Sequence, residues 1–342
     1  MPKDNENIPP IFLGPLAPSE PQGFKLEEMV TCDECLRANA PTRVTCMYCG
    51  KPLPVNEATA RLRRPTLRAP EKNQPGFNSI IIPQQSVPTE TQFAQIAGLL
   101  RLEDAALRQI IDSNLPLPLA RTSTREESEL VSDRLAELGL NVLSIGDEEL
   151  GLDEPYTRVR ALMFHTDSLS FHQAGHGDVS EVLLSDLRLF VTARIIRSQI
   201  EIRERKTRKA GEEIVDSSQF YSDELVIDLY STDERKSWRI SSNNFDFSCL
   251  GESKALLAGE NFNRLTQQFL ERAPNAELDI SYNKLRSLLE FGWPSEVETT
   301  STGWKRERPG KYVVGAATSN SNEEQFTRYS RLRFYLTSRC LI

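Results

Sequence analysis

The chain has 342 residues and a formal net charge of −8 at pH 7. That length predicts two or three domains, and the acidic balance argues against a general nucleic-acid binder, because phosphate neutralisation needs a basic face. No stretch approaches the ~18 consecutive apolar residues of a membrane-spanning helix, and the first residues are polar where a secretory signal is apolar. Two isolated thiols, Cys249 and Cys340, suit a reducing compartment. We therefore expect a cytoplasmic protein.

Residues 1–28 are rich in proline and polar side chains. With so little apolar surface to bury, this segment is expected to be disordered alone. Its short apolar patch, Ile11–Leu16, is a candidate for docking on a partner.

Two CxxC pairs define the next segment, residues 29–53. Cys32 and Cys35 form the first pair, and Cys46 and Cys49 form the second pair ten residues further on. Each pair places two thiolates on one side of a tight turn, so two pairs at this separation predict a four-cysteine zinc ribbon. Soft thiolate ligands favour Zn²⁺. With all four ligands supplied by the protein, the expected single zinc ion is structural.

The full pattern is Cys32-x2-Cys35-x3-Asn39-x6-Cys46-x2-Cys49. It resembles the short zinc ribbons near the N-terminus of many bacterial multidomain proteins, and its spacing resembles that of Ran-binding-protein-type zinc fingers, some of which bind single-stranded RNA. The resemblance implies a zinc site but no particular reaction. Val30 stands where the zinc-finger family usually has a Trp, so the aromatic side chain for base stacking is missing.

Residues 54–90 are predicted to be a linker, because they carry several prolines and a basic cluster. The cluster comprises Arg61, Arg63, Arg64 and Arg68. A short β-like run, Phe77–Ile82, leaves a second interpretation open, in which the segment becomes ordered against a partner.

Residues 91–150 are predicted to be a small α/β module. Apolar residues recur at helical spacing over 91–113, with a break near 98–104. A proline-containing edge strand over 115–120 precedes a helix that starts at Ser123 or Thr124 and ends at Gly139. A strand follows over 141–145. The helix–Gly–strand ending resembles the C-terminal domain of the bacterial ribosomal stalk protein, which implies a recognition module.

Residues 156–292 are predicted to be a β domain with C-terminal helices. Period-two patterns indicate strands over 158–165, 168–172, 179–184, 188–204, 224–230 and 237–240. Helices are expected over 251–272 and 280–291. The order of elements resembles pleckstrin-homology-like antiparallel barrels, in which a helix plugs one end. The predicted fold class is therefore α+β multidomain.

Residues 293–327 are polar and are predicted to be a second linker, and residues 328–342 a β-prone tail. The tail mixes arginines and aromatic residues in an alternating pattern. We expect it to bind a protein partner, or to pack on the β domain, by strand addition. The candidate contact residues are Tyr329, Arg331, Arg333, Phe334 and Tyr335.

No enzymatic motif is present: GxSxG, HExxH, GxxxxGK[ST] and GxGxxG are all missing. His165, His172 and His176 lie close together, but the last two fall at a strand end and in a Gly-rich turn, which favours ordinary histidines over a second metal site. The sequence therefore predicts a protein that is not an enzyme.

We expect a non-enzymatic, zinc-containing adaptor or scaffold that assembles protein partners in a bacterial cytoplasm. One alternative is a nucleic-acid-associated regulator that uses the ribbon, the Arg61–Arg68 cluster and the tail. Another is a peripheral membrane protein that uses the basic run Arg203–Lys209.

Overall fold

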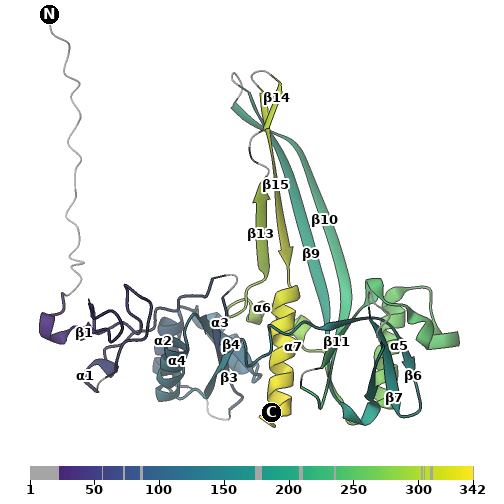
Figure 1. Cartoon of the computed structure of the whole chain (residues 1–342), viewed down its shortest axis with the longest axis horizontal. Helices are drawn as coiled ribbons and strands as arrows, with labels where there is room; N and C mark the ends of the chain where they lie inside the picture. Colours follow the sequence, from purple (N-terminus) through teal and green to yellow (C-terminus); the bar gives the residue numbers. More distant parts are fainter. Residues whose placement is uncertain are drawn as a thin grey trace, which may run out of the picture. The chain divides into compact units, whose positions relative to one another are not determined.

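The computed structural model describes residues 23–55, 57–71, 74–84, 88–173, 179–207, 211–234, 236–301, 303, 305–308 and 311–341. The chain divides into two compact units, Met1–Thr66 and Leu67–Ile342, and contains both helices and sheets (Figure 1). The predicted α+β class is therefore confirmed. The docking patch Ile11–Leu16 and most of the segment predicted to be disordered lie outside the described residues.

Unit 1 is a small fold with very short elements. They are a 3₁₀ turn η1 (Leu26–Glu28), β1 (Val30–Thr31), β2 (Ala38–Asn39) and α1 (Glu57–Ala60). Its buried cluster comprises only Val30, Cys32, Cys46 and Leu53, with Cys35 packed against it. So small a core stabilises little by itself, and the thiols are part of it.

Unit 2 begins with a three-stranded sheet in the order β4-β3-β5. Its elements are β3 (Phe77–Ile81), α2 (Glu90–Leu100), α3 (Asp104–Asp112), β4 (Leu117–Thr122), α4 (Arg125–Glu137) and β5 (Val142–Gly146).

Most of the sequence predictions for this part are confirmed. The first helical stripe is split into α2 and α3, and β4 is an edge strand. Thr124 caps α4 by accepting a hydrogen bond from the Glu127 amide, and Gly139 follows the helix with a left-handed φ of 86°. The linker prediction is wrong for β3, which is the central strand of this sheet. Prolines on both sides of the run suggested a linker, but four of its five residues are buried.

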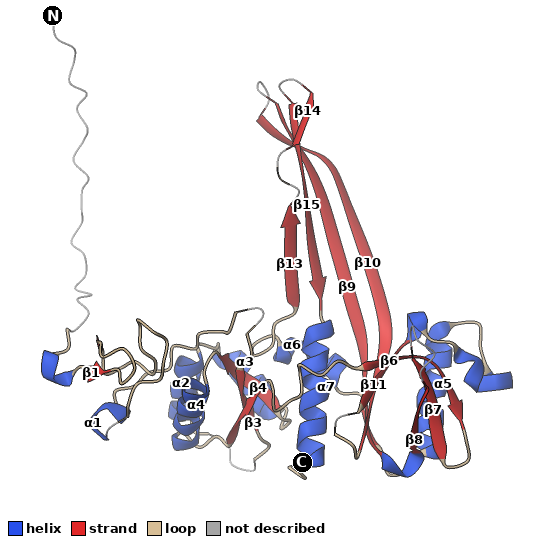
Figure 2. Ribbon diagram, viewed as in Figure 1, coloured by secondary structure: helices blue, strands red, loops and turns tan. Residues whose placement is uncertain are grey.

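The large sheet of unit 2 has the strand order β13-β15-β9-β10-β11-β6-β7-β8 (Figure 2). Its strands are β6 (Thr157–Phe164), β7 (Ser168–Gln173), β8 (Val179–Leu183), β9 (Leu187–Thr207), β10 (Gly211–Ser231), β11 (Ser237–Ser241), β12 (Glu277–Asp279), β13 (Glu296–Ser301), β14 (Lys305–Arg308) and β15 (Lys311–Ser321).

Two strand pairs in this sheet are parallel: β11 with β6, and β12 with β9. The prediction of a purely antiparallel, pleckstrin-like meander is therefore wrong in its pairing, because β6 pairs antiparallel with β7 on one side and parallel with β11 on the other. The period-two patterns located β6, β7, β8, β11 and most of β9, but they missed the first half of β10 and all of β12 to β15.

The helices of the second half are the 3₁₀ turns η2 (Leu184–Asp186), η3 (Ser242–Asn244) and η4 (Phe247–Ser253), and the helices α5 (Ala258–Arg272), α6 (Tyr282–Leu289) and α7 (Glu323–Ser338). Helix α5 buries Phe262, Leu265 and Phe269 in one core with strands β6–β11. In the part of the chain that the structure describes, no helix is both long and apolar enough to cross a membrane.

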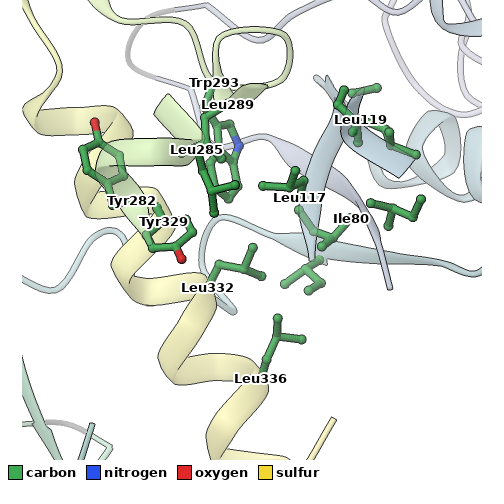
Figure 3. Close-up of a cluster of buried hydrophobic side chains, with 14 of the residues drawn as sticks. Ile80, Leu117, Leu119, Tyr282, Leu285, Leu289, Trp293, Tyr329, Leu332 and Leu336 are labelled. Carbon is green, nitrogen blue, oxygen red and sulfur yellow. The ribbon is translucent and has the colours of Figure 1, made fainter. Parts of the chain in front are cut away.

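A second core joins the small sheet to α6 and α7 (Figure 3). Leu289 and Trp293 pack with Leu117 and Ile80, and Leu332 comes from α7. The indole Nε1 of Trp293 donates a 2.7 Å hydrogen bond to Asn78 Oδ1 on β3. Residues of the predicted 91–150 and 156–292 modules therefore share one core.

Two predictions near the C-terminus are wrong. Residues 293–327 were predicted to be a linker, yet they contain β13, β14 and β15. The tail was predicted to be a strand, yet it belongs to α7. Phe326, Tyr329 and Leu332 are buried at three-residue steps, a helical spacing that begins before residue 328. The predicted tail began at residue 328 and therefore left out the first turn of the helix, which begins at Glu323.

Asp147, just after β5, binds groups from four places in unit 2. Its carboxylate accepts hydrogen bonds from the Gly76 amide, from Asn78, and from Arg121 and Arg328 at 2.5 and 2.9 Å. Burial favours the neutral acid, but the two arginines and Asn78 outweigh it and hold the pKa of Asp147 below its usual range. Arg328 is on α7, so this carboxylate fastens α7 to the small sheet.

We predict that Asp147→Asn lowers the free energy of unfolding of unit 2 by about 3 kcal/mol at pH 7, because it leaves the largely buried Arg121 without a counter-charge and Arg328 with Glu324 alone. Since the folded pKa is lowered, this contribution is complete above the unfolded pKa of ~3.9 and is lost as pH falls through the folded value. Urea unfolding at pH 7 and pH 3 measures both effects.

The matched control is Glu137→Gln, which breaks the exposed ion pair with Arg134. It should cost less than ~1 kcal/mol. Equal losses in the two variants would show that Asp147 has no special structural role.

Candidate metal centre

The four cysteines of unit 1 form a candidate metal-binding site. Their Sγ atoms all lie within 4.8 Å of one another. The Sγ atoms of Cys32 and Cys49 are 3.6 Å apart, and those of Cys35 and Cys46 are 3.5 Å apart. A tetrahedron with zinc–sulfur bonds of ~2.3 Å has sulfur–sulfur edges of about 3.8 Å. The thiols therefore already stand close to the geometry of a four-thiolate site, as the CxxC spacing predicts.

Two turns with the same backbone hydrogen bonds hold the thiols. In the first, the Leu36 amide donates to Cys32 O and the Cys32 amide donates to Arg37 O. In the second, the Gly50 amide donates to Cys46 O and the Cys46 amide donates to Lys51 O. Leu36 and Gly50 occupy equivalent positions, with left-handed φ values of 58° and 73°. Each CxxC pair thus folds as the same knuckle.

Asn39 links the two knuckles. Its Nδ2 donates to Cys46 Sγ at 3.4 Å and to Arg37 O at 2.9 Å, and its Oδ1 accepts from the Met47 amide at 2.9 Å. The side chain is fully buried. Partners of this kind orient metal ligands and tune their basicity.

The pKa values of the thiols differ because their hydrogen bonds differ. Burial opposes ionisation of Cys46, but donation from the amides of Tyr48 and Cys49 and from Asn39 outweighs it and lowers the pKa of Cys46 to about 6. The Lys51 amide lowers the pKa of Cys49, but burial and the neighbouring thiols prevail and raise it to about 12. Cys46 thus ionises before Cys49, and metal binding requires both as thiolates.

The donor set fits a closed structural metal site. Four sulfur ligands from the protein complete a tetrahedral shell and leave no position for an activated water. Bound there, a metal ion would fix both knuckles and complete the small core of unit 1.

The tail residues predicted to bind a partner instead make contacts inside unit 2. Tyr329 donates to Asp279 Oδ2 at 2.8 Å, and Arg333 pairs with the same carboxylate at 2.6 Å. Arg331 donates to Glu154 O at 2.8 Å, and Phe334 stacks on Tyr230 with ring centroids 4.4 Å apart. Tyr335 packs against the core containing α7. Strand addition by these residues is excluded because they are helical.

The histidines do not join a metal cluster in the described part of the chain. The four cysteines form the cluster there, and neither His165 nor His172 belongs to it. His165 Nε2 hydrogen-bonds Ser170 Oγ at 2.7 Å. His176 lies outside the described residues.

The basic segments are only partly free to bind an external ligand. The Arg63 guanidinium is buried and donates to Leu53 O and Pro54 O, so it belongs to the fold of unit 1. Arg203 and Arg205, which belong to the basic run Arg203–Lys209, lie on β9. The sequence analysis missed that β9 and β10 continue as one long hairpin. The residues of β10 before 224 are polar at most positions, so they gave no buried-strand pattern.

Comparison of the chain with protein-family models, with curated proteins and with solved structures found no match.

We predict that the purified chain binds one metal ion per molecule and that Cys46→Ser abolishes this binding and unfolds unit 1, because metal binding supplies the folding energy of so small a fold. Asn39→Ala should weaken the affinity about 10- to 100-fold. Elemental analysis and chelator competition measure the two effects.

Cys340→Ser is the matched control, since this exposed thiol lies in unit 2. It should leave the metal content unchanged. Unchanged metal content in Cys46→Ser would refute the assignment of the ligands.

The equivalence of the two knuckles yields another prediction. Gly50→Ala should destabilise metal-loaded unit 1 by about 1 kcal/mol, because a β-carbon disfavours a left-handed φ. Leu36→Gly should change stability little, since relief of the same strain is offset by the ~0.5–1 kcal/mol entropic cost of glycine. The midpoint of chelator-induced unfolding distinguishes the two variants. Equal destabilisation by Gly50→Ala and Leu36→Gly would contradict the prediction.

Proposed function

We propose that this protein is a non-enzymatic, zinc-containing scaffold that assembles protein partners, and that the long arm of unit 2 is its docking element. The arm comprises β9 from Ile196, β10 up to Asp223, and strands β13 to β15, which run on beyond the helices (Figure 1). The observation that carries the proposal is that no described residue of this arm is buried.

The burial pattern ends abruptly at the base of the arm. Ile195 is fully buried, and the next buried residue described along the chain is Glu224. In the other hairpin, Trp293 and Asn322 are buried and none of the described residues between them is. Ordering each residue costs ~1–2 kcal/mol, and an inter-strand hydrogen bond returns a net ~0.5–1.5 kcal/mol. A sheet without a core is thus marginal alone, and a partner that covers it would stabilise it.

Zinc is the metal we propose for unit 1. Four soft thiolates in tetrahedral geometry suit zinc, whereas magnesium and calcium prefer oxygen ligands. A closed shell supports a structural role, and this agrees with the lack of catalytic motifs. The proposed location is the cytoplasm, where unpaired thiols such as Cys249 and Cys340 persist.

Protein partners are favoured over nucleic acid because several tail arginines are already paired. Arg328 binds Asp147 and Glu324, and Arg333 binds Asp279. Carboxylates this close neutralise the charge of these arginines, so little of that charge is left to bind phosphates.

We predict that shortening the arm removes protein partners without unfolding the rest. The strand register offers clean positions for the cuts, since Gln199 pairs with Phe220 and Glu298 pairs with Ser319. Replacing 200–219 and 299–318 each by an Asn-Gly turn would close two short hairpins. Metal content and the main thermal transition should be retained, while partners captured in the presence of nuclease should be lost.

Full retention of partners by the shortened protein would contradict the proposal. Loss of every wild-type partner on nuclease treatment would instead favour the nucleic-acid alternative.

A further inference from the structure

The arm has two faces of different chemistry, and the strand register defines them. One face carries Ser198, Ile200 and Ile202 of β9, and we name it the isoleucine face. In register beside them on the other strands lie Ser217, Gln219, Tyr221, Ala316, Thr318, Asn320, Val297, Thr299 and Ser301. None of these side chains is charged. Towards the tip, Ile214 and Val314 flank Glu204 on the same face.

The opposite face is charged. It carries Arg197, Glu201, Arg203, Asp216, Glu296 and Glu298. In a chain of 26% charged residues, this separation is the alternation of a half-buried sheet. Yet Ile200, Tyr221 and Val297 are 38%, 71% and 60% exposed. Between Ser198 and Ile202 the isoleucine face combines exposed apolar side chains with uncharged polar ones, and nothing in the described chain covers it.

We infer that the isoleucine face packs against the isoleucine face of a second copy of this chain, forming a two-sheet sandwich. This inference rests on the proposed role of the arm in assembly and names its partner. Between Ser198 and Ile202 the face carries no charge, so this part meets its own copy without like-charge repulsion. Nucleic acid does not suit this part, because it offers no basic side chain there. A bilayer interior does not suit it either, because Gln219 and Asn320 would be buried in hydrocarbon.

The distribution of large and small side chains supports self-association. The isoleucines lie on β9, while the neighbouring β15 carries Ala316 and Thr318 at the same levels. A two-fold axis parallel to the strands reverses the strand order of the second sheet, so β9 of one copy lies over β15 of the other. Ile200 and Ile202 then face small side chains, which allows close packing.

The available area suits a weak, concentration-dependent dimer. The uncharged part of the face spans five residues on each of four strands, from Ser198 to Ile202 on β9. At ~3.3 Å per residue and ~4.8 Å between strands it measures about 17 by 19 Å, so two such faces bury on the order of 600 Å², the size of a transient contact.

The test is the self-association of the full chain, measured by sedimentation equilibrium on two matched pairs of variants. Tyr221→Glu and Ala316→Arg place a charge on the isoleucine face. Phe220→Glu and Ala317→Arg place the same charges one residue away, on the opposite face. Each altered residue lies in the arm outside both cores, and circular dichroism checks that each variant folds.

The wild type should form a dimer. Tyr221→Glu and Ala316→Arg should raise its dissociation constant at least tenfold, and Phe220→Glu and Ala317→Arg should change it less than twofold. A wild type that is monomeric at every concentration would overturn the inference, as would equal effects of all four variants. A dimer that forms only after deletion of residues 1–22 would also overturn it, because the N-terminal segment and not a second copy would then be the occupant of the face. Flotation of the wild type with neutral phosphatidylcholine vesicles, abolished by Tyr221→Glu, would assign the face to lipid.

The experiments distinguish failure of the dimer inference from failure of the proposed scaffold function. A monomeric wild type whose protein partners still depend on the arm would remove the second copy as occupant and leave the scaffold function standing.

Discussion

Strand β9 is the constraint on which unit 2 depends, because both cores and the arm are built on it. Leu189 and Val191 lie in the core with α6 and α7, while Phe190 lies in the core with α5. The strand pairs with β10 on one side and with β15 and β12 on the other. Its 21 residues far exceed the ~5–6 of a common strand. Both cores end at its middle, and its second half is the arm.

The two units are stabilised by different means. Unit 1 has almost no apolar core, and a metal ion bound by its four cysteines would take the place of that core. The body of unit 2 is held by two cores and by buried ion pairs, such as Arg239 with Asp228 at 2.6 Å. The arm has neither a core nor a metal site. This contrast is why the proposed function is centred on the arm and the metal is given a structural role.

The sequence predicted the features whose causes are local. The thiol positions follow from CxxC turns, α4 from its Thr124 cap, and the end of α4 from Gly139. The arm was predicted only in its β9 part, because the first half of β10 and strands β13 to β15 are polar at most positions and gave no apolar alternation. Helix α7 was missed because the alternation of arginines and aromatic residues suggested a strand, whereas the partners of Arg331 and Arg333, Glu154 and Asp279, are distant in sequence. Parallel pairing of β6 with β11 depends on the tertiary fold and leaves no local signal.

Amide hydrogen exchange measured as a function of protein concentration tests the central claim most directly. The claim is that the arm is ordered chiefly by what covers it. We expect protection of amides in 196–207 and 211–223 to rise with protein concentration, while protection of Leu189–Ile195 in the same strand stays constant. Equal protection of the arm at all concentrations would contradict the claim, because the arm would then be stable without a second molecule.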